Sequence, residues 1–236
     1  MQSKLDLATA LAYLAAASYE KAAISFLKIG PPKDLGDWIG KVGFSCICDY
    51  CNWTVEPYFQ LVAPGDIAIY GTLCALATFQ RSAIKSKILE NSIFGSYIEQ
   101  EPYMRELIES YMNSNFKVVL ELLSRYSVRS FGYFPTHLNL YFILFQTRHS
   151  IDVHLSPHVP ELMNLIRNSA VVLYFQPFAT IKLDRMSVAF GWTMEEVEQH
   201  IVNLIQSGTI QGRVDSQNKV REGFFLFSFD NLCPSL

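Results

Sequence analysis

The sequence predicts a mostly α-helical fold, in which an array of helices is followed by a small unit of helices and short strands. Hydrophobic residues make up 50% of the 236 residues and charged residues only 17%, which is typical of a chain with a large core. Apolar residues recur at helical spacing over most of residues 4–29 and 64–124. Beyond Pro177 short β-type runs alternate with two helical stretches.

Residues 1–36 are expected to form a helical hairpin that divides near Ser18. Five of its residues follow the spacing of one tetratricopeptide (TPR) repeat: Ala10, Tyr13, Tyr19, Ala22 and Phe26. In such a repeat small residues lie where two antiparallel helices approach closely. An ordinary helical hairpin fits these residues equally well, so the pattern indicates a TPR-like packing of helix on helix and leaves a true repeat open.

Residues 63–176 are expected to form a helical bundle. The turn residues Pro64, Gly65 and Asp66 begin a buried helix that reaches Phe79. Shorter amphipathic stretches follow as far as residue 124. A last helix begins near residue 160 and ends before Pro177, because proline cannot continue a helix.

Residues 177–220 are expected to form a winged helix with a small β-sheet. Residues 180–183 predict a strand and residues 184–190 a helix. Thr193 and Glu196 form a capping box that begins a second helix, and Gly208 ends it. Residues 209–214 and 219–220 predict a hairpin, which leaves 221–236 as an irregular tail.

The charges argue against nucleic acid as a partner. The chain has 19 Lys and Arg residues against 22 Asp and Glu residues, so it has no basic excess to neutralise phosphates. The second helix of the winged helix could lie in a groove of DNA, but it carries Glu195, Glu196 and Glu198 and no cation. We therefore expect no specific nucleic-acid binding.

Protein contact is the better use of the small sheet. An exposed strand edge recruits another strand through main-chain hydrogen bonds. So few charges on the whole chain also favour a surface that is partly covered by other subunits. The residues expected at this docking edge are Ile181, Leu183, Ile210, Val214 and Val220.

No catalytic, cofactor or metal site is expected. The chain has no HExxH, Walker or GxSxG motif. Cys46, Cys48 and Cys51 lack a fourth zinc ligand nearby, and reduced thiols are the better interpretation. Three histidines near Asp152 lie in an expected loop and are interpreted as surface residues: His149, His154 and His158.

The sequence also favours a soluble intracellular protein. Its first residues lack the pattern of a signal peptide. Its longest apolar run, residues 138–145, falls far below the roughly 18 residues of a membrane span, so no membrane contact is expected. Five cysteines without secretory features indicate reduced thiols and no disulfides.

Two stretches resemble the PCI-domain family, the scaffold module of the proteasome lid, the COP-nine signalosome and a translation initiation factor. They are APGDIAIYGTLCALATFQR at 63–81 and IRNSAVVLYFQPFATIKLDRMSVAFGWTMEEVEQHIVNLIQSGTIQGRVDSQNKV at 166–220. Within the family, the sequence of residues 63–81 resembles the signalosome member more than the proteasome lid member. A proteasome lid regulatory subunit and a winged-helix nucleic-acid-binding protein are the alternatives.

The resemblance implies a non-catalytic scaffold, found in nucleus and cytoplasm, whose PCI domains join through the sheets of their winged helices. It also implies a complex that removes the ubiquitin-like protein NEDD8 from cullins through a different, metalloprotease subunit. Three aromatic, aperiodic stretches depart from the family pattern: 41–62, 127–151 and 221–236. We expect these stretches, which look like translated introns, to be dispensable or absent from the natural product. The chain is also shorter than the family pattern, without the further N-terminal repeats and the C-terminal helix.

Overall fold

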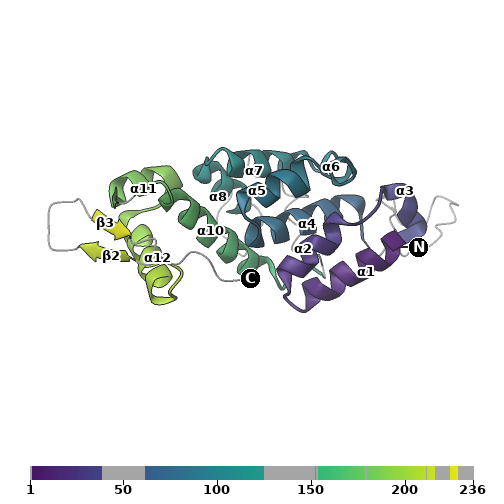
Figure 1. Cartoon of the computed structure of the whole chain (residues 1–236), viewed down its shortest axis with the longest axis horizontal. Helices are drawn as coiled ribbons and strands as arrows, with labels where there is room; N and C mark the ends of the chain where they lie inside the picture. The colour runs from purple at the N-terminus through teal and green to yellow at the C-terminus, as the bar shows by residue number, and fades with distance from the viewer. Residues whose placement is uncertain are drawn as a thin grey trace, which may run out of the picture.

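The structure is a computed structural model that describes residues 2–38, 62–124, 152, 154–178, 180–210, 212–215 and 224–227. The described part is mostly α-helical and long in one direction (Figure 1). The N-terminal helices lie at one end of the molecule, and strands β2 and β3 lie at the other.

The N-terminal end is a pair of helices, α1 (Gln2–Ala15) and α2 (Tyr19–Leu27), which pack side by side. Each helix buries one stripe of small, aliphatic or aromatic side chains at helical spacing, among them Leu7, Ala10, Leu14, Ala22 and Phe26. The expected helical hairpin in residues 1–36 is therefore present. The single helical turn α3 (Pro32–Leu35) and the 3₁₀ turn η1 (Gly36–Trp38) follow it.

Helix α4 (Pro64–Thr78) forms the middle of the array and is buried almost all round. It packs against α2, α6, α7 and α10. Its first turn is fixed by the N–H of Ala63, which donates to the carboxylate of Asp66 at 3.0 Å. Gly71 lets its neighbours come close, because a Cβ at this position would lie 2.8 Å from the ring of Phe94 and 3.2 Å from Cβ of Phe26.

Five short elements form one side of the array: α5 (Arg81–Ile84), the π-helical turn η2 (Lys85–Leu89), α6 (Ser92–Ile98), α7 (Pro102–Met112) and α8 (Phe116–Ser124). Helix α10 (Val159–Phe175) then runs from the array to the C-terminal unit (Figure 1). Every described secondary-structure element between residues 64 and 175 is thus a helix or a helical turn. No helix in these or the other described ranges combines the length and apolar character that crossing a membrane requires.

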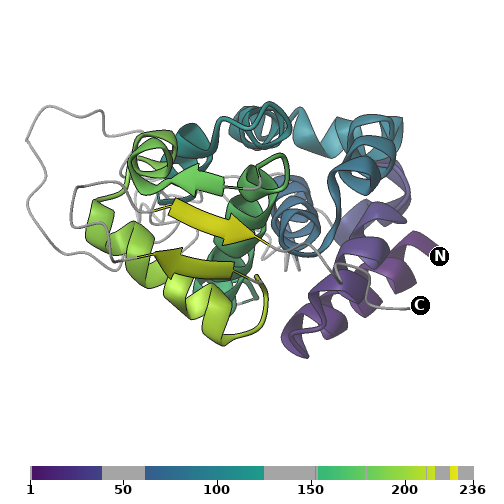
Figure 2. The same cartoon turned by 60° about the vertical axis from the view of Figure 1, so that its left-hand side comes forward.

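The C-terminal unit consists of β1 (Thr180–Lys182), α11 (Leu183–Phe190), α12 (Met194–Gln206), β2 (Gly212–Asp215) and β3 (Phe224–Phe227). The three strands form an antiparallel sheet in the order β1-β3-β2 (Figure 2). The predicted capping box is confirmed: the N–H of Glu196 donates to Oγ1 of Thr193 at 3.2 Å, and the N–H of Thr193 donates to the carboxylate of Glu196 at 2.9 Å. Gly208 follows α12 with a φ of 73°, as expected for a left-handed helix stop.

The position of the third strand corrects the sequence prediction. The second strand of the hairpin was expected at residues 219–220, which lie outside the described residues, whereas the strand that pairs is Phe224–Phe227. This strand lies within 221–236, the stretch expected to be an irregular and dispensable tail. Its aromatic residues favour extended backbone, and pairing on both sides places it in the centre of the sheet. The stretches 41–61 and 127–151 lie outside the described residues.

Aromatic side chains join the C-terminal unit to the helical array. Phe190 of α11 stacks on Phe116 of α8, with ring centroids 5.3 Å apart and an interplanar angle of 4°. Tyr174 of α10 meets both rings edge-on, at 5.3 Å and 6.2 Å. These rings hold α11 against two helices of the array, because edge-on and stacked ring pairs stabilise packing by more than the burial of their apolar surface alone.

Candidate protein-docking site

The sheet of the C-terminal unit has two outer strands. Because β3 lies in the middle, β1 and β2 each pair on one side only within the described residues. Half of the main-chain N–H and C=O groups of such a strand point away from the sheet and can accept a strand of another chain. The outer edges of β1 and β2 are therefore the candidate docking edges, and they belong to two separate strands.

The structure brings two of the five expected docking residues together across β3. Ile181 of β1 lies opposite Phe225 on one side, and Val214 of β2 lies opposite the same residue on the other side. The two residues therefore share one row that crosses the whole sheet. Val220, the fifth expected residue, lies outside the described residues.

Three of the expected docking residues have buried side chains. Ile181 is 4% exposed, Leu183 is 6% exposed and Ile210 is 8% exposed. Leu183 is the first residue of α11, so the strand predicted for 180–183 ends one residue earlier. These side chains belong to the core of the chain itself, and any strand partner has to bind the main chain of the edges instead.

Ile210 also differs from the prediction in its main chain. It precedes β2, and its N–H donates to the carbonyl of Leu204 at the end of α12, at 3.2 Å. A proline at this position would thus remove a contact between α12 and β2. The strand that the sequence predicts from residue 209 thus begins only at Gly212, after Ile210.

Asp152, near which the sequence has three histidines, connects α4 to the residues that precede α10 through hydrogen bonds. The carboxylate of Asp152 accepts the N–H groups of His154 and Leu155, at 2.9 Å and 3.1 Å, and the hydroxyl of Tyr70 from α4. His154 and His158 are partly buried and partly exposed, which does not contradict their interpretation as surface residues. His149 lies outside the described residues.

A second group of hydrogen bonds connects α2 to the start of α10. The hydroxyl of Tyr19 donates to the carboxylate of Glu161 at 2.5 Å and lies 3.2 Å from Nδ1 of His158. Burial, with the hydrogen bond to Glu161 as the next cause, raises the pKa of Tyr19 above its ordinary value. This tyrosine is therefore neutral at physiological pH and acts as a hydrogen-bond donor.

The cysteines give no sign of redox or metal chemistry in the described residues. Cys74 of α4 is a buried free thiol, and burial raises its pKa to about 12, so it stays protonated and unreactive. Within the same ranges no group of three or more His, Cys, Asp or Glu side chains could hold a metal ion. Cys46, Cys48 and Cys51 lie outside the described residues.

Sequence reasoning missed a cluster that joins α10, α12 and the turn before α12. The ring of His200 lies 5.1 Å from that of Trp192, and the guanidinium of Arg167 lies 6.0 Å from the same indole. Burial, followed by the nearby charge of Arg167, lowers the pKa of His200. These residues come from two helices and the turn between α11 and α12, so no local spacing pattern could have found them.

The outer face of α12 is acidic, as the sequence predicts. Glu195, Glu196 and Glu198 are all exposed. The helix that could enter a groove of DNA thus presents negative charge to phosphates, which opposes binding.

Comparison with known proteins gives a consistent result. Residues 138–221 match the PCI domain. The chain is 34% identical to COP9 signalosome complex subunit 1 of Arabidopsis thaliana over 220 residues, which cover 93% of this chain and 41% of that protein. It is 32% identical to the subunit 1 of Neurospora crassa over 164 residues, which cover 70% of this chain and 34% of that protein.

A weaker similarity extends to the proteasome. The chain is 23% identical over 168 residues to 26S proteasome non-ATPase regulatory subunit 6 of Caenorhabditis elegans, covering 70% of this chain and 37% of that protein. The chain spans about two fifths or less of the length of these relatives. The chain is thus similar to COP9 signalosome subunit 1 along most of its length, and its residues 138–221 match the PCI domain.

Proposed function

We propose that this chain is a non-catalytic scaffold subunit of the COP9 signalosome, a complex that the family resemblance links to deneddylation and the control of cullin-RING ubiquitin ligases. The observation that carries the proposal is the similarity to subunit 1 of that complex over 93% of the chain. The described residues add a continuous hydrophobic core. A scaffold needs such a rigid body and surfaces for its neighbours. Localisation to nucleus and cytoplasm is part of the proposal.

We further infer that the C-terminal unit is a winged helix and that the helices before it form a TPR-like array. The order strand, helix, helix, strand, strand and the β1-β3-β2 sheet support a winged helix. The close packing of α1 on α2 through small residues supports a TPR-like hairpin. Together these elements suit the architecture of a PCI scaffold.

The proposed contact with neighbouring PCI subunits uses the main chain of a sheet edge. Strand β2 is the more accessible choice for a test, because β1 continues directly into α11. Consecutive N–H groups along a strand point to opposite sides, so one of Arg213 and Val214 donates toward β3 and the other away from it. A proline at the outward-pointing position removes a docking donor and leaves the sheet intact.

The test compares Arg213→Pro and Val214→Pro, each expressed as the full chain in cells that contain the other subunits. Circular dichroism and thermal denaturation identify the variant that still folds like the parent. We expect this folded variant to lose co-purification with neighbouring subunits. Val188→Ser is the matched control, because Val188 is 79% exposed on α11, and it should co-purify normally. Normal co-purification of both proline variants would contradict the use of the β2 edge.

A proteasome lid subunit is the second candidate, favoured only by the weaker similarity to non-ATPase regulatory subunit 6. Mass spectrometry of the proteins that co-purify with the full chain separates the two. Co-purifying signalosome subunits would support the proposal, and lid subunits without signalosome subunits would favour the second candidate.

A gel-shift assay with DNA tests the absence of specific nucleic-acid binding. At about 0.15 M salt, where screening weakens non-specific contacts, it is expected to show no sequence-dependent complex.

A further inference from the structure

A second surface lies on the helical array, far along the chain from the sheet. It consists of four exposed side chains on η2 and the start of α6, here called the 85–93 ridge: Lys85, Lys87, Leu89 and Ile93. Leu89 is 48% exposed and Ile93 is 44% exposed. Five large hydrophobic side chains are exposed within residues 2–210 of the described part, and two of them, Leu89 and Ile93, lie only four positions apart. Such a concentration of exposed apolar surface indicates a contact site.

The backbone of the ridge is held firmly by the core. Ile84 and Ile88, on the inner side of α5 and η2, are 0% and 1% exposed. The side-chain oxygen of Asn91 accepts the N–H groups of Ile93 and Phe94, both at 3.1 Å, and its amide donates to the carbonyl of Leu27 in α2 at 3.2 Å. Leu89 and Ile93 are therefore presented from a fixed support, which reduces the ordering cost of binding.

The hydrogen bonding of η2 is unusual. The N–H of Glu90 donates to the carbonyl of Lys85 at 3.1 Å, five residues earlier, which makes this turn a π-helix. Such turns are rare and are frequently found at functional sites. The unusual turn thus coincides with the exposed apolar pair.

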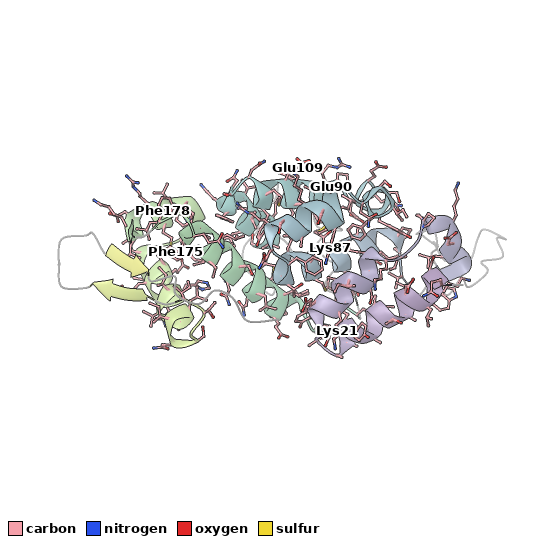
Figure 3. All side chains as sticks on the ribbon, in the orientation of Figure 1. Lys21, Lys87, Glu90, Glu109, Phe175 and Phe178 are labelled. Carbon is pink, nitrogen blue, oxygen red and sulfur yellow. The ribbon has the colours of Figure 1, made fainter. Side chains whose placement is uncertain are left out.

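The charge of the ridge points to the chemistry of its partner. Residues 85–93 contain two basic residues, Lys85 and Lys87, and one acid, Glu90, whereas the whole chain has a net charge of −3. Lys85 and Lys87 are exposed, and the ammonium of Lys87 lies 4.7 Å from the centre of the Phe79 ring. Figure 3 labels Lys87 and Glu90, which lie near the middle of the long molecule. A basic, apolar surface on an acidic protein is complementary to an acidic segment with apolar side chains.

We propose that the 85–93 ridge binds an acidic segment of a partner protein. Apolar side chains of that segment pack on Leu89 and Ile93, and its carboxylates pair with Lys85 and Lys87. This contact is separate from the sheet edge and does not depend on the main chain of β1 or β2. If the ridge contact is absent, the proposed sheet-edge contact can still form. If the sheet-edge contact is absent, the ridge contact can still form.

The experiment places a photo-crosslinking amino acid, benzoylphenylalanine, at position 89 of the full chain within its native complex. Mass spectrometry then identifies the crosslinked peptide. We expect a peptide from another protein that contains Asp or Glu beside apolar residues. The same probe at position 188 is the control, because Val188 is also highly exposed but lies on α11, and it should not capture this peptide.

Charge-changing variants complete the test. Lys85→Glu combined with Lys87→Glu should reduce the yield of that crosslink about tenfold, since it replaces attraction by repulsion at two positions. Lysines at the acidic positions of the captured segment should restore it. Glu90→Lys should keep or raise the yield. A captured segment that is neutral or basic, a crosslink to nucleic acid or to this chain itself, no crosslink at all, or a yield unchanged by the double reversal would each overturn the proposal. All three positions are exposed, so thermal denaturation should stay unchanged.

Discussion

At the scale of single residues, the packing of the helical array depends on glycines, which have no side chain, as well as on large side chains. Gly71 lies in the most buried helix, between Phe94 of α6 and Phe26 of α2. Gly95 lies within α6, and a Cβ added there meets nothing within 4 Å. The same substitution at these two glycines therefore has opposite expected effects.

We expect Gly71→Ala to lower the free energy of unfolding, because overpacking costs about 1–3 kcal/mol and exceeds the gain in helix propensity. Gly95→Ala should raise it by about 0.5–1 kcal/mol, since alanine favours the helix and has room. Urea denaturation of both variants measures the two changes. Stabilisation by Gly71→Ala would show that the ring of Phe94 moves away at little cost.

His200 makes stability depend on pH. Because its pKa is lower in the folded state than in the unfolded state, the unfolded chain takes up a proton first as the pH falls. Its stabilising contribution is complete above a pH of about 6.5, the ordinary pKa of histidine, and is lost below that value. We expect His200→Phe, which keeps a ring beside Trp192, to have a smaller decrease in melting temperature between pH 7 and pH 5 than the parent. Equal decreases would contradict this role of His200.

At the scale of elements, the sheet depends on its middle strand. Removal of residues 221–236 deletes β3, which is the partner of both β1 and β2. We expect the shortened chain to lose protection from hydrogen exchange at 180–182 and 212–215, while α4 stays protected because its contacts lie within the array. Protection of β1 and β2 at the level of the full chain would show that 221–236 is dispensable after all.

Helix boundaries could be predicted because they depend on nearby residues. Pro64 begins α4, Thr193 and Glu196 begin α12, and Gly208 follows its end, each through local chemistry. The strand Phe224–Phe227 could not be predicted in the same way. Its run of adjacent aromatics has no alternation, and one of its two partner strands, β1, lies far away in the sequence, as Thr180 opposite Leu226 shows.

At the scale of the whole molecule, contacts between distant residues turn separate elements into one body. The bond from Tyr19 to Glu161 joins residues 142 positions apart, and Tyr70 reaches Asp152 across 82. At the other end of α10, ring contacts join α8, α10 and α11 through Phe116, Tyr174 and Phe190. Of the candidate docking site, the sequence predicted the small sheet and its acidic neighbour α12, but which strand lies in the middle depends on the fold of the whole unit.

The central place of β3 also has a consequence for synthesis on the ribosome. The helices of the array have most of their partners within residues 2–175, so they can pack while the chain is still growing. The sheet cannot close until Phe227 has left the exit tunnel, because β1 and β2 have no common partner before then. Only a chain translated past this point can present the edge on which the proposed assembly depends, so prematurely ended products are excluded from it.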